Sequence, residues 1–226
     1  MARKSQTPKP PRRVQAPQPR TERTPDERRT WRALIVVGAL GFVGLAIALG
    51  FIFFGRSESA SAALEGAGCT VQTYPSQGQD HVQELPDGFE YNSTPPTTGP
   101  HNPVAAPFDL YEEPVDPLRL VHNLEHGGVV IQFGSEIPRE QVDRIAEWWR
   151  DDPNGIVVAS LPELEDQIAL AAWTADYSGS NPEPTDQRGV LAKCPAFDEA
   201  AFDAFLDEYG FRGPERFERI NLAPGT

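Results

Sequence analysis

The sequence predicts a single α+β domain over residues 68–218, with a small, mainly antiparallel sheet and two to three helices, preceded by a disordered basic arm and one transmembrane helix. From residue 118 onward, strand-like and helix-like hydrophobic patterns alternate, as in mixed α and β chains. Residues 1–32 hold ten Lys or Arg side chains against three acids, a net +7, so the overall −13 leaves −20 for residues 33–226. A basic N-terminal part is therefore joined to an acidic folded domain.

The basic N-terminal part, residues 1–31, is predicted to be a disordered cytoplasmic arm. It holds six prolines and almost no large apolar side chain, so it cannot bury enough surface to offset the entropy of ordering. A basic arm can bind nucleic acid, but beside a membrane the simpler interpretation is attraction to the anionic headgroups of the lipid bilayer. We therefore expect lipid, and not nucleic acid, as the partner of this arm.

A transmembrane helix is expected within residues 32–55. The run Ala33–Phe54 contains 22 residues and no charged side chain. At about 1.5 Å per residue, such a helix spans the roughly 30 Å hydrocarbon core of a bilayer. Three arginines precede the run, at positions 28, 29 and 32, whereas only Arg56 follows closely. The positive-inside rule then keeps the N-terminus in the cytoplasm and places the C-terminal domain outside the cell membrane, as a single-pass signal anchor.

A linker is expected at residues 56–67, which are rich in Ser and Ala. The folded domain then begins near Cys69, and the chain has one other cysteine, Cys194, near the far end of the domain. Because an extracytoplasmic compartment is oxidising, these two cysteines are expected to form a disulfide. In the chain-entropy model, a bridge over so long a loop contributes about 4 to 5 kcal/mol.

Residues 69–117 are expected to be mostly ordered loop, because they are dense in Pro, Gly, Asn and Thr. Thr70–Tyr74 and Phe89–Asn92 are the strand candidates within this stretch. Two of the chain's histidines also lie here, beside turn residues. The loops are therefore expected to carry part of the functional site.

A short helix is predicted over Leu118–His126. Asp116 fits an N-cap, Pro117 the first helical position and Gly127 the C-terminal cap. A strand is the rival interpretation, because leucines and histidines occupy every second position from Leu118 to His126, as in a half-buried strand. Residues i and i+4 lie about 6 Å apart on a helix but about 13 Å apart on a strand. Only the helix would allow one ion to contact both histidines of this stretch.

The elements that follow alternate between strand and helix patterns. Strands are expected at Gly128–Phe133, Ile156–Leu161 and Gln167–Tyr177, and helices at Pro138–Asp151 and Phe197–Tyr209. Residues 219–226 are expected to form a C-terminal tail beyond the domain.

All four histidines of the chain fall between positions 81 and 126, and this clustering is the main functional signal. Neutral imidazole suits Zn²⁺ or Cu²⁺, so His122 and His126 with His81 or His101 would supply three or four ligands to one ion. Glu125 would be a further ligand or would orient a ligating histidine. We therefore predict a transition-metal site formed from these five residues.

Two other interpretations remain open. The histidines can instead hold the proline-rich loops by hydrogen bonds, in a non-catalytic envelope domain that binds another envelope protein. A metal-dependent hydrolase ranks third, because the sequence lacks the His-Glu-x-x-His motif, a Gly-x-Ser-x-Gly elbow and a phosphate-binding glycine loop. The charge of −20 after residue 32 disfavours nucleic acid and favours cations or basic partners. The chain is therefore interpreted as a binding protein before an enzyme.

Two longer motifs carry a resemblance to a known family. Tyr91–His101 reads YNSTPPTTGPH and Val121–Ile131 reads VHNLEHGGVVI, and both resemble signatures of the bacterial family called domain of unknown function 3105. The resemblance covers Cys69–Phe217 and implies an extracytoplasmic domain tethered to the membrane, with no activity assigned. Thr98 stands where the family pattern is expected to hold serine, which argues against any role that needs the serine hydroxyl.

Overall fold

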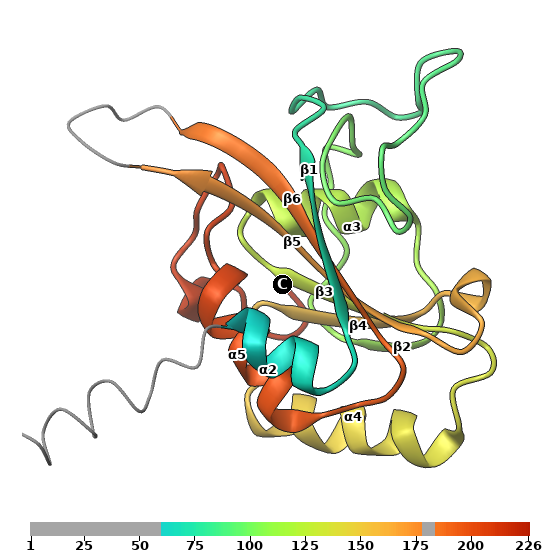
Figure 1. Ribbon diagram of the computed structural model, residues 1–226. Helices are drawn as coiled ribbons and strands as arrows, with labels where there is room; N and C mark the ends of the chain where they lie inside the picture. The colour runs from blue at the N-terminus through green and yellow to red at the C-terminus, as the bar shows by residue number, and fades with distance from the viewer. Residues whose placement is uncertain (1–59, 178–183) are drawn as a thin grey trace, which may run out of the picture. The chain divides into compact units, whose positions relative to one another are not determined.

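The computed structural model describes residues 60–177 and 184–226 (Figure 1). The expected basic arm and the transmembrane helix expected at residues 32–55 lie outside the described residues. Within the two described ranges, no helix is both long enough and apolar enough to cross a bilayer.

A six-stranded sheet forms the centre of the domain, with the strand order β1-β6-β5-β3-β4-β2 (Figure 1). The strands are β1 (Thr70–Pro75), β2 (Leu110–Pro114), β3 (Val129–Phe133), β4 (Ile156–Ser160), β5 (Ile168–Asp176) and β6 (Thr185–Cys194). The pairs β1–β6, β6–β5 and β5–β3 are antiparallel, whereas β4 runs parallel to both β3 and β2. The α+β class is therefore confirmed, and the sheet is larger and more mixed than expected.

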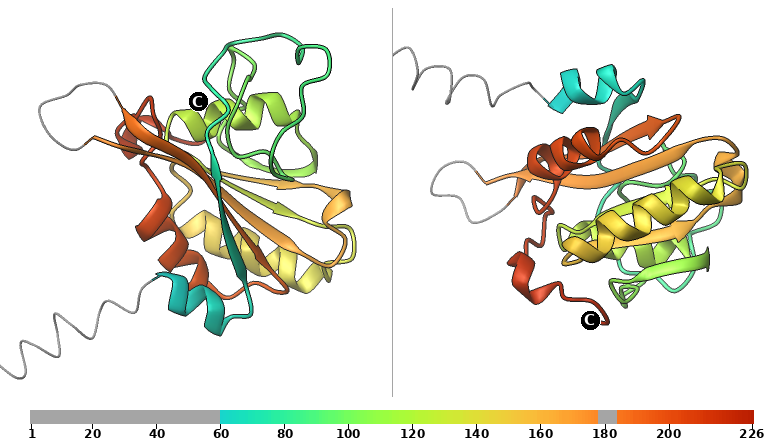
Figure 2. Two further views of the ribbon diagram at one scale, coloured as in Figure 1. Left: turned by 45° about the horizontal axis from the view of Figure 1, so that its top comes forward. Right: turned by 90° about the horizontal axis from the view of Figure 1, so that it is seen from below.

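Four α-helices flank the sheet within the described residues, where two to three were expected. They are α2 (Ala60–Gly66), α3 (Pro117–Glu125), α4 (Arg139–Asp151) and α5 (Glu199–Tyr209), with short 3₁₀ helices η1 (Pro162–Leu164) and η2 (Arg219–Asn221). Helices α2, α4 and α5 lie on one face of the sheet, and α3 with its neighbouring loops lies on the other (Figure 2). Apolar side chains of each layer pack against the strands. The domain therefore has three layers.

The central strands are apolar on both faces because each face is covered. On β3, Val129, Ile131 and Phe133 contact the layer of α2, α4 and α5, whereas Val130 contacts the layer of α3. Every residue of β3 is buried, as a strand covered on both sides requires. The helix α4 joins β3 to β4, and such a crossover is what a parallel pair needs.

Five parts of the sequence form different structure from the expectation, and two of them are strands β2 and β6, which were not expected. The stretch expected as a linker contains helix α2. This helix is stabilised because Ala60 and Leu64, four residues apart, bury one helical face beside α5. Phe89–Asn92 forms no strand and stays in the loop between β1 and β2. Leu222, in the stretch expected as a tail, is buried against the α3 side of the sheet, and its carbonyl accepts a hydrogen bond from the Gly155 amide.

The disulfide between Cys69 and Cys194 is confirmed. Cys69 lies just before β1 and Cys194 ends β6, and these two strands pair antiparallel. The bridge therefore fastens one end of a strand pair whose cysteines are 125 residues apart in the sequence. Such a bridge is typical of proteins that fold outside the cytoplasm.

The helical interpretation of the histidine segment is also confirmed. Asp116 caps α3, with its Oδ1 accepting a hydrogen bond from the Leu118 amide at 2.9 Å, and Pro117 is the first helical residue. Gly127 follows the helix with a φ of +88°, a conformation that favours glycine. A side chain at Gly127 would also meet the backbone of Phe211 and Gly213 at 3.2 Å. The helix therefore ends where the C-terminal residues pack against it.

Candidate metal centre

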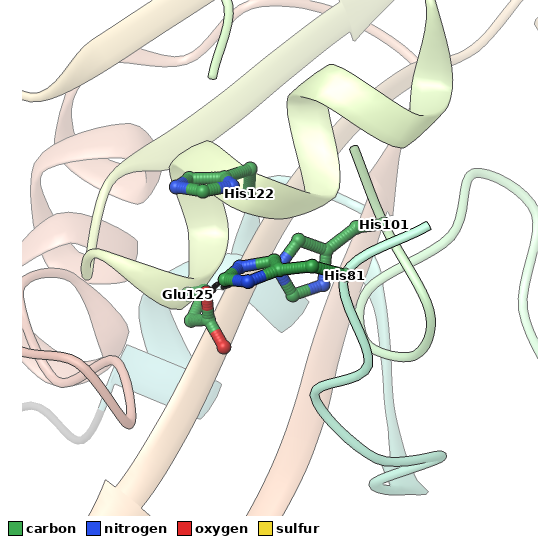
Figure 3. Close-up of side chains that lie close together, drawn as sticks. All are labelled: His81, His101, His122 and Glu125. Atoms are coloured by element: carbon green, nitrogen blue, oxygen red, sulfur yellow. Dashed lines mark hydrogen bonds and ion pairs between the residues drawn. The ribbon is translucent and has the colours of Figure 1, made fainter. Parts of the chain in front are cut away.

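Helix α3 and two loops bring three histidines and one carboxylate together (Figure 3). His122 and Glu125 are three residues apart on α3, so both face the loops. His81 and His101 come from two loop segments that pair as an isolated β-bridge. In this bridge the Val82 amide donates to the His101 carbonyl at 2.7 Å, and the His101 amide donates to the Asp80 carbonyl at 2.9 Å. The loop histidines are therefore placed by backbone pairing.

The spacing of the ligand atoms suits a first-row cation. Glu125 Oε2 lies 2.9 Å from His101 Nε2 and 3.4 Å from His81 Nε2. Ligand atoms of His81, His101, His122 and Glu125 all lie within 4.8 Å of one another. In a tetrahedral zinc site with bonds of about 2.0 to 2.1 Å, neighbouring ligand atoms are about 3.3 Å apart. The four side chains therefore need only small movements to surround one ion.

Backbone carbonyls fix the orientation of two of the imidazoles. His101 Nδ1 lies 2.8 Å from the Gly99 carbonyl oxygen, and His122 Nδ1 lies 2.7 Å from that of Asn102. Because a carbonyl oxygen can only accept, both Nδ1 atoms must carry the proton and donate. Nε2 of each ring is then the atom that faces the cluster. This is the arrangement that orients metal-ligating histidines.

Two glutamines extend the polar cluster from Glu125 to β6. Gln79 Nε2 donates to Glu125 Oε1 at 2.9 Å, and Gln187 Nε2 donates to Gln79 Oε1 at 2.9 Å. Gln79 holds the carboxylate so that its other oxygen, Oε2, remains directed at the loop histidines, and Gln187 holds Gln79. These glutamines were not expected from the sequence, because Gln79 lies two residues before His81 but only the fold directs its side chain at Glu125.

His126 lies at the margin of the cluster, next to a glutamate that the sequence did not indicate. Its Nε2 is 3.1 Å from His122 Nε2 and 3.6 Å from Glu215 Oε2. Glu125, His126 and Glu215 form a second group whose ligand atoms lie within 4.8 Å of one another. The structure thus brings His122 and His126 together as the helix predicted. It places His126 in this second group, apart from the one that contains both loop histidines.

A C-terminal strap, residues 211–217, delivers Glu215 to the site. Its amides cap carbonyls at the end of α3 and just beyond: Phe211 donates to Gly127 at 2.8 Å, Glu215 to Glu125 at 3.0 Å and Phe217 to His126 at 3.3 Å. The last carbonyls of a helix have no partner within it, so these bonds meet a general need of helix ends. The strap has no periodic hydrophobic pattern, so no sequence motif indicated a role for Glu215.

Burial and charge give the two central residues opposite pKa shifts. Burial works to lower the pKa of His101, but its hydrogen bonds to Glu125 and the Gly99 carbonyl outweigh burial and raise that pKa. Burial works to raise the pKa of Glu125, yet hydrogen bonds from His101 and Gln79 bring it below the usual value. Both side chains are almost fully buried, with 0% and 1% exposed. Without a cation they form a buried imidazolium–carboxylate pair.

The imidazoles of His122, on α3, and His126, which caps the helix, are neutral. Burial, followed by the charge of His101, lowers the pKa of His122 against the opposing hydrogen bond to the Asn102 carbonyl. Burial and the nearby His122 lower the pKa of His126 to about 4. A neutral imidazole has a free lone pair, which is the form that binds a metal ion. His122 and His126 therefore offer neutral imidazoles at physiological pH.

The loop that carries His101 is seated on the sheet. Thr97 and Thr98 are fully buried and lie over Gly189 of β6, where a Cβ atom would overlap the Thr97 side chain. Tyr91 OH donates to the Pro100 carbonyl at 2.6 Å, and Thr98 Oγ1 accepts from the Gln77 amide at 3.2 Å. The Thr98 hydroxyl thus holds the loop in place. This loop is the second half of the motif quoted above for its family resemblance.

Two of the comparisons with known proteins found no match, and one identifies a family. No curated protein and no solved structure matches the chain. The family described as "Protein of unknown function (DUF3105)" matches residues 81–219, a stretch that contains all four histidines, Glu125 and Glu215. Because this match covers more than half of the chain, the protein belongs to the DUF3105 family.

Proposed function

We propose that this domain binds a first-row transition-metal ion, Zn²⁺ or Cu²⁺, through His81, His101, His122 and Glu125. The observation that carries the proposal is the convergence of these ligand atoms within 4.8 Å around a carboxylate that is 1% exposed. Three imidazoles and one carboxylate form a donor set typical of zinc and copper sites. The Nδ1 hydrogen bonds of His101 and His122 support it, because they aim Nε2 at the cluster.

The buried ion pair is the state that the cation would replace. Burying an ionised carboxylate is costly unless it is paired, and without a metal the proton on His101 Nε2 supplies that pairing. A divalent cation would take the place of this proton and would contact His81 as well. Since His101 has a raised pKa, binding must release a proton, and affinity must fall as the pH drops.

We further propose that the domain works outside the cytoplasm, anchored by the apolar segment expected at residues 32–55. The disulfide supports an oxidising compartment. The domain is also acidic, with −20 over residues 33–226 because the chain carries −13 and its first 32 residues +7. An acidic domain attracts cations from its surroundings. The basic arm would then face the anionic inner surface of the membrane.

Metal analysis of the purified full-length chain tests the metal proposal directly. After incubation with Zn²⁺ or Cu²⁺ and dialysis, we expect stoichiometric metal in the wild type and its loss in His101→Ala and Glu125→Gln. Glu113→Gln is the matched control, because Glu113 is an exposed carboxylate on edge strand β2. Circular dichroism would verify that each variant is folded.

Asn123, on α3, is not a suitable control residue. Asn123 carries no metal role in the proposal, but it is buried and its side chain makes two hydrogen bonds to the backbone of Ala106. Its substitution would disturb the loop under α3 whatever the histidines do. A wild-type chain that holds no metal at neutral pH would contradict the proposal. The histidines would then be loop-fixing groups, with a cost of about 1 to 3 kcal/mol on substitution.

A further inference from the structure

We infer that the site holds a second, outer cation beside the first, bound by His126 and Glu215 and sharing Glu125 with the inner ion. The inference rests on the proposed function, because the shared carboxylate belongs to the inner site. The geometry that points to it is the second group of ligand atoms, from Glu125, His126 and Glu215, that lie within 4.8 Å of one another. These two groups have one residue in common, Glu125.

A carboxylate has enough lone pairs for this shared role. Glu125 Oε2 faces His101 and His81, while Oε1 accepts a hydrogen bond from Gln79. An ionised carboxylate offers about four lone-pair positions on its two oxygens, so the bond from Gln79 leaves room for a second cation. Two ions that share ligands in proteins commonly lie about 3.5 to 4 Å apart. The shared carboxylate also reduces their mutual repulsion.

His122 and His126 lie close enough together to bind two adjacent ions. Their Nε2 atoms are 3.1 Å apart, and without cations two neutral imidazole nitrogens at this distance share one proton. His122 belongs to the inner group, and His126 Nε2 lies 3.6 Å from Glu215 Oε2 on the outer side. When this proton moves to Nδ1 of His126, that ring stays neutral and each ring can give its Nε2 lone pair to its own ion.

The outer position is part of the built structure and not only an exposed acid near a histidine. The Glu215 amide donates to the Glu125 carbonyl at 3.0 Å, so the backbone of the outer ligand is bonded to the backbone of the shared one. Phe217 also packs on His126, with ring centroids 4.4 Å apart, which restricts the imidazole. The strap thus fixes both outer ligands relative to α3.

The two positions differ in chemistry and in access to solvent. The inner ion would have three imidazoles and one carboxylate, whereas the outer ion would have one imidazole and two carboxylates. Oxygen-rich sites suit harder cations such as Mn²⁺ as well as Zn²⁺. His126 is 21% and Glu215 50% exposed, so the outer ion would keep water ligands and bind more weakly. We therefore expect two binding steps, inner before outer.

Native mass spectrometry of the full-length chain titrated with Zn²⁺ tests the inference. We expect two ions per wild-type chain at saturation and one ion in both Glu215→Gln and His126→Ala. Glu218→Gln is the matched control, because Glu218 is an exposed acid three residues away in the sequence, and it should retain two ions. Loaded with Cu²⁺, the wild type should show a magnetically coupled pair by electron paramagnetic resonance, and Glu215→Gln an isolated ion.

The outcomes separate this inference from the proposed function. A wild-type chain that binds a single ion, unaffected by Glu215→Gln, would overturn the second position and leave the inner site standing. Two ions that persist in Glu215→Gln would place the second ion elsewhere and would also overturn the inference. A wild type that binds no ion would remove both proposals.

Discussion

Gln79 decides which oxygen of Glu125 faces the loop histidines. Its amide donates to Oε1, and it is itself held by Gln187. Gln79→Ala would free the carboxylate to rotate, so we expect metal affinity to fall about 10- to 100-fold, as for other residues that orient a ligand. Isothermal titration calorimetry would measure the change. Gln83→Ala is the control, because Gln83 is an exposed amide in the same loop, and an equal loss in both variants would contradict the role of Gln79.

His126 gives the metal-free protein a defined pH dependence. Its pKa in the folded state is lowered to about 4, so between pH about 6.5 and 4 the unfolded chain binds a proton that the folded chain does not. The free energy of unfolding should therefore decrease as the pH falls through this window. His122, whose pKa is also lowered, acts in the same direction. The raised pKa of His101 affects stability only at higher pH.

Urea unfolding of the metal-free protein at pH 7 and pH 5 would measure this effect. For His126→Phe we expect a smaller difference in unfolding free energy between the two pH values, by about 1 to 2 kcal/mol. An unchanged pH dependence would show that the His126 imidazole does not resist protonation. At this scale the sequence anticipated the histidines and Glu125 but not Glu215, since only the folded strap brings residue 215 beside residue 126.

At the level of elements, Gly189 of β6 provides the space in which the His101 loop is seated. A methyl group there would overlap Thr97, which is fully buried against the sheet. Gly189→Ala should therefore displace the loop, lower the free energy of unfolding by about 1 to 3 kcal/mol and weaken metal binding. Thermal unfolding and metal titration would check both effects. Gly78→Ala is not a suitable control for this steric effect, because the positive φ of Gly78 would add backbone strain to an alanine.

The elements that could be predicted are those whose formation depends on local sequence patterns. Helix α3 carries its own caps, Asp116 and Gly127, and strand β3 is apolar at every position except Gln132. Strand β6 was missed because its first half is polar and exposed, and only its second half is buried by neighbours. Helix α2 has seven residues, too few for local propensity to stabilise, and it depends on packing beside α5. Tertiary contacts decided these elements.

At the level of the whole molecule, the disulfide stabilises the domain without contributing to the metal site. The cysteines join the apolar cluster on the face of α2, α4 and α5, whereas α3 packs on the opposite face. We expect the Cys69→Ser, Cys194→Ser double variant to lose up to about 4 kcal/mol of unfolding free energy but to keep its metal stoichiometry. Denaturation midpoints with metal analysis would test this. Loss of metal from a still-folded double variant would contradict it.

The contact between the strap and α3 has a consequence for the time order of folding. The inner ligands lie within residues 81–125, but the residues that hold and complete the site come from positions 187 and 215. Such distant contacts form late, because the loop-closure entropy must be overcome first. An ion that binds only the folded arrangement is therefore acquired at the end of folding. Metal uptake during refolding would then proceed at the rate of global folding. A bound ion would therefore indicate that the domain is completely folded.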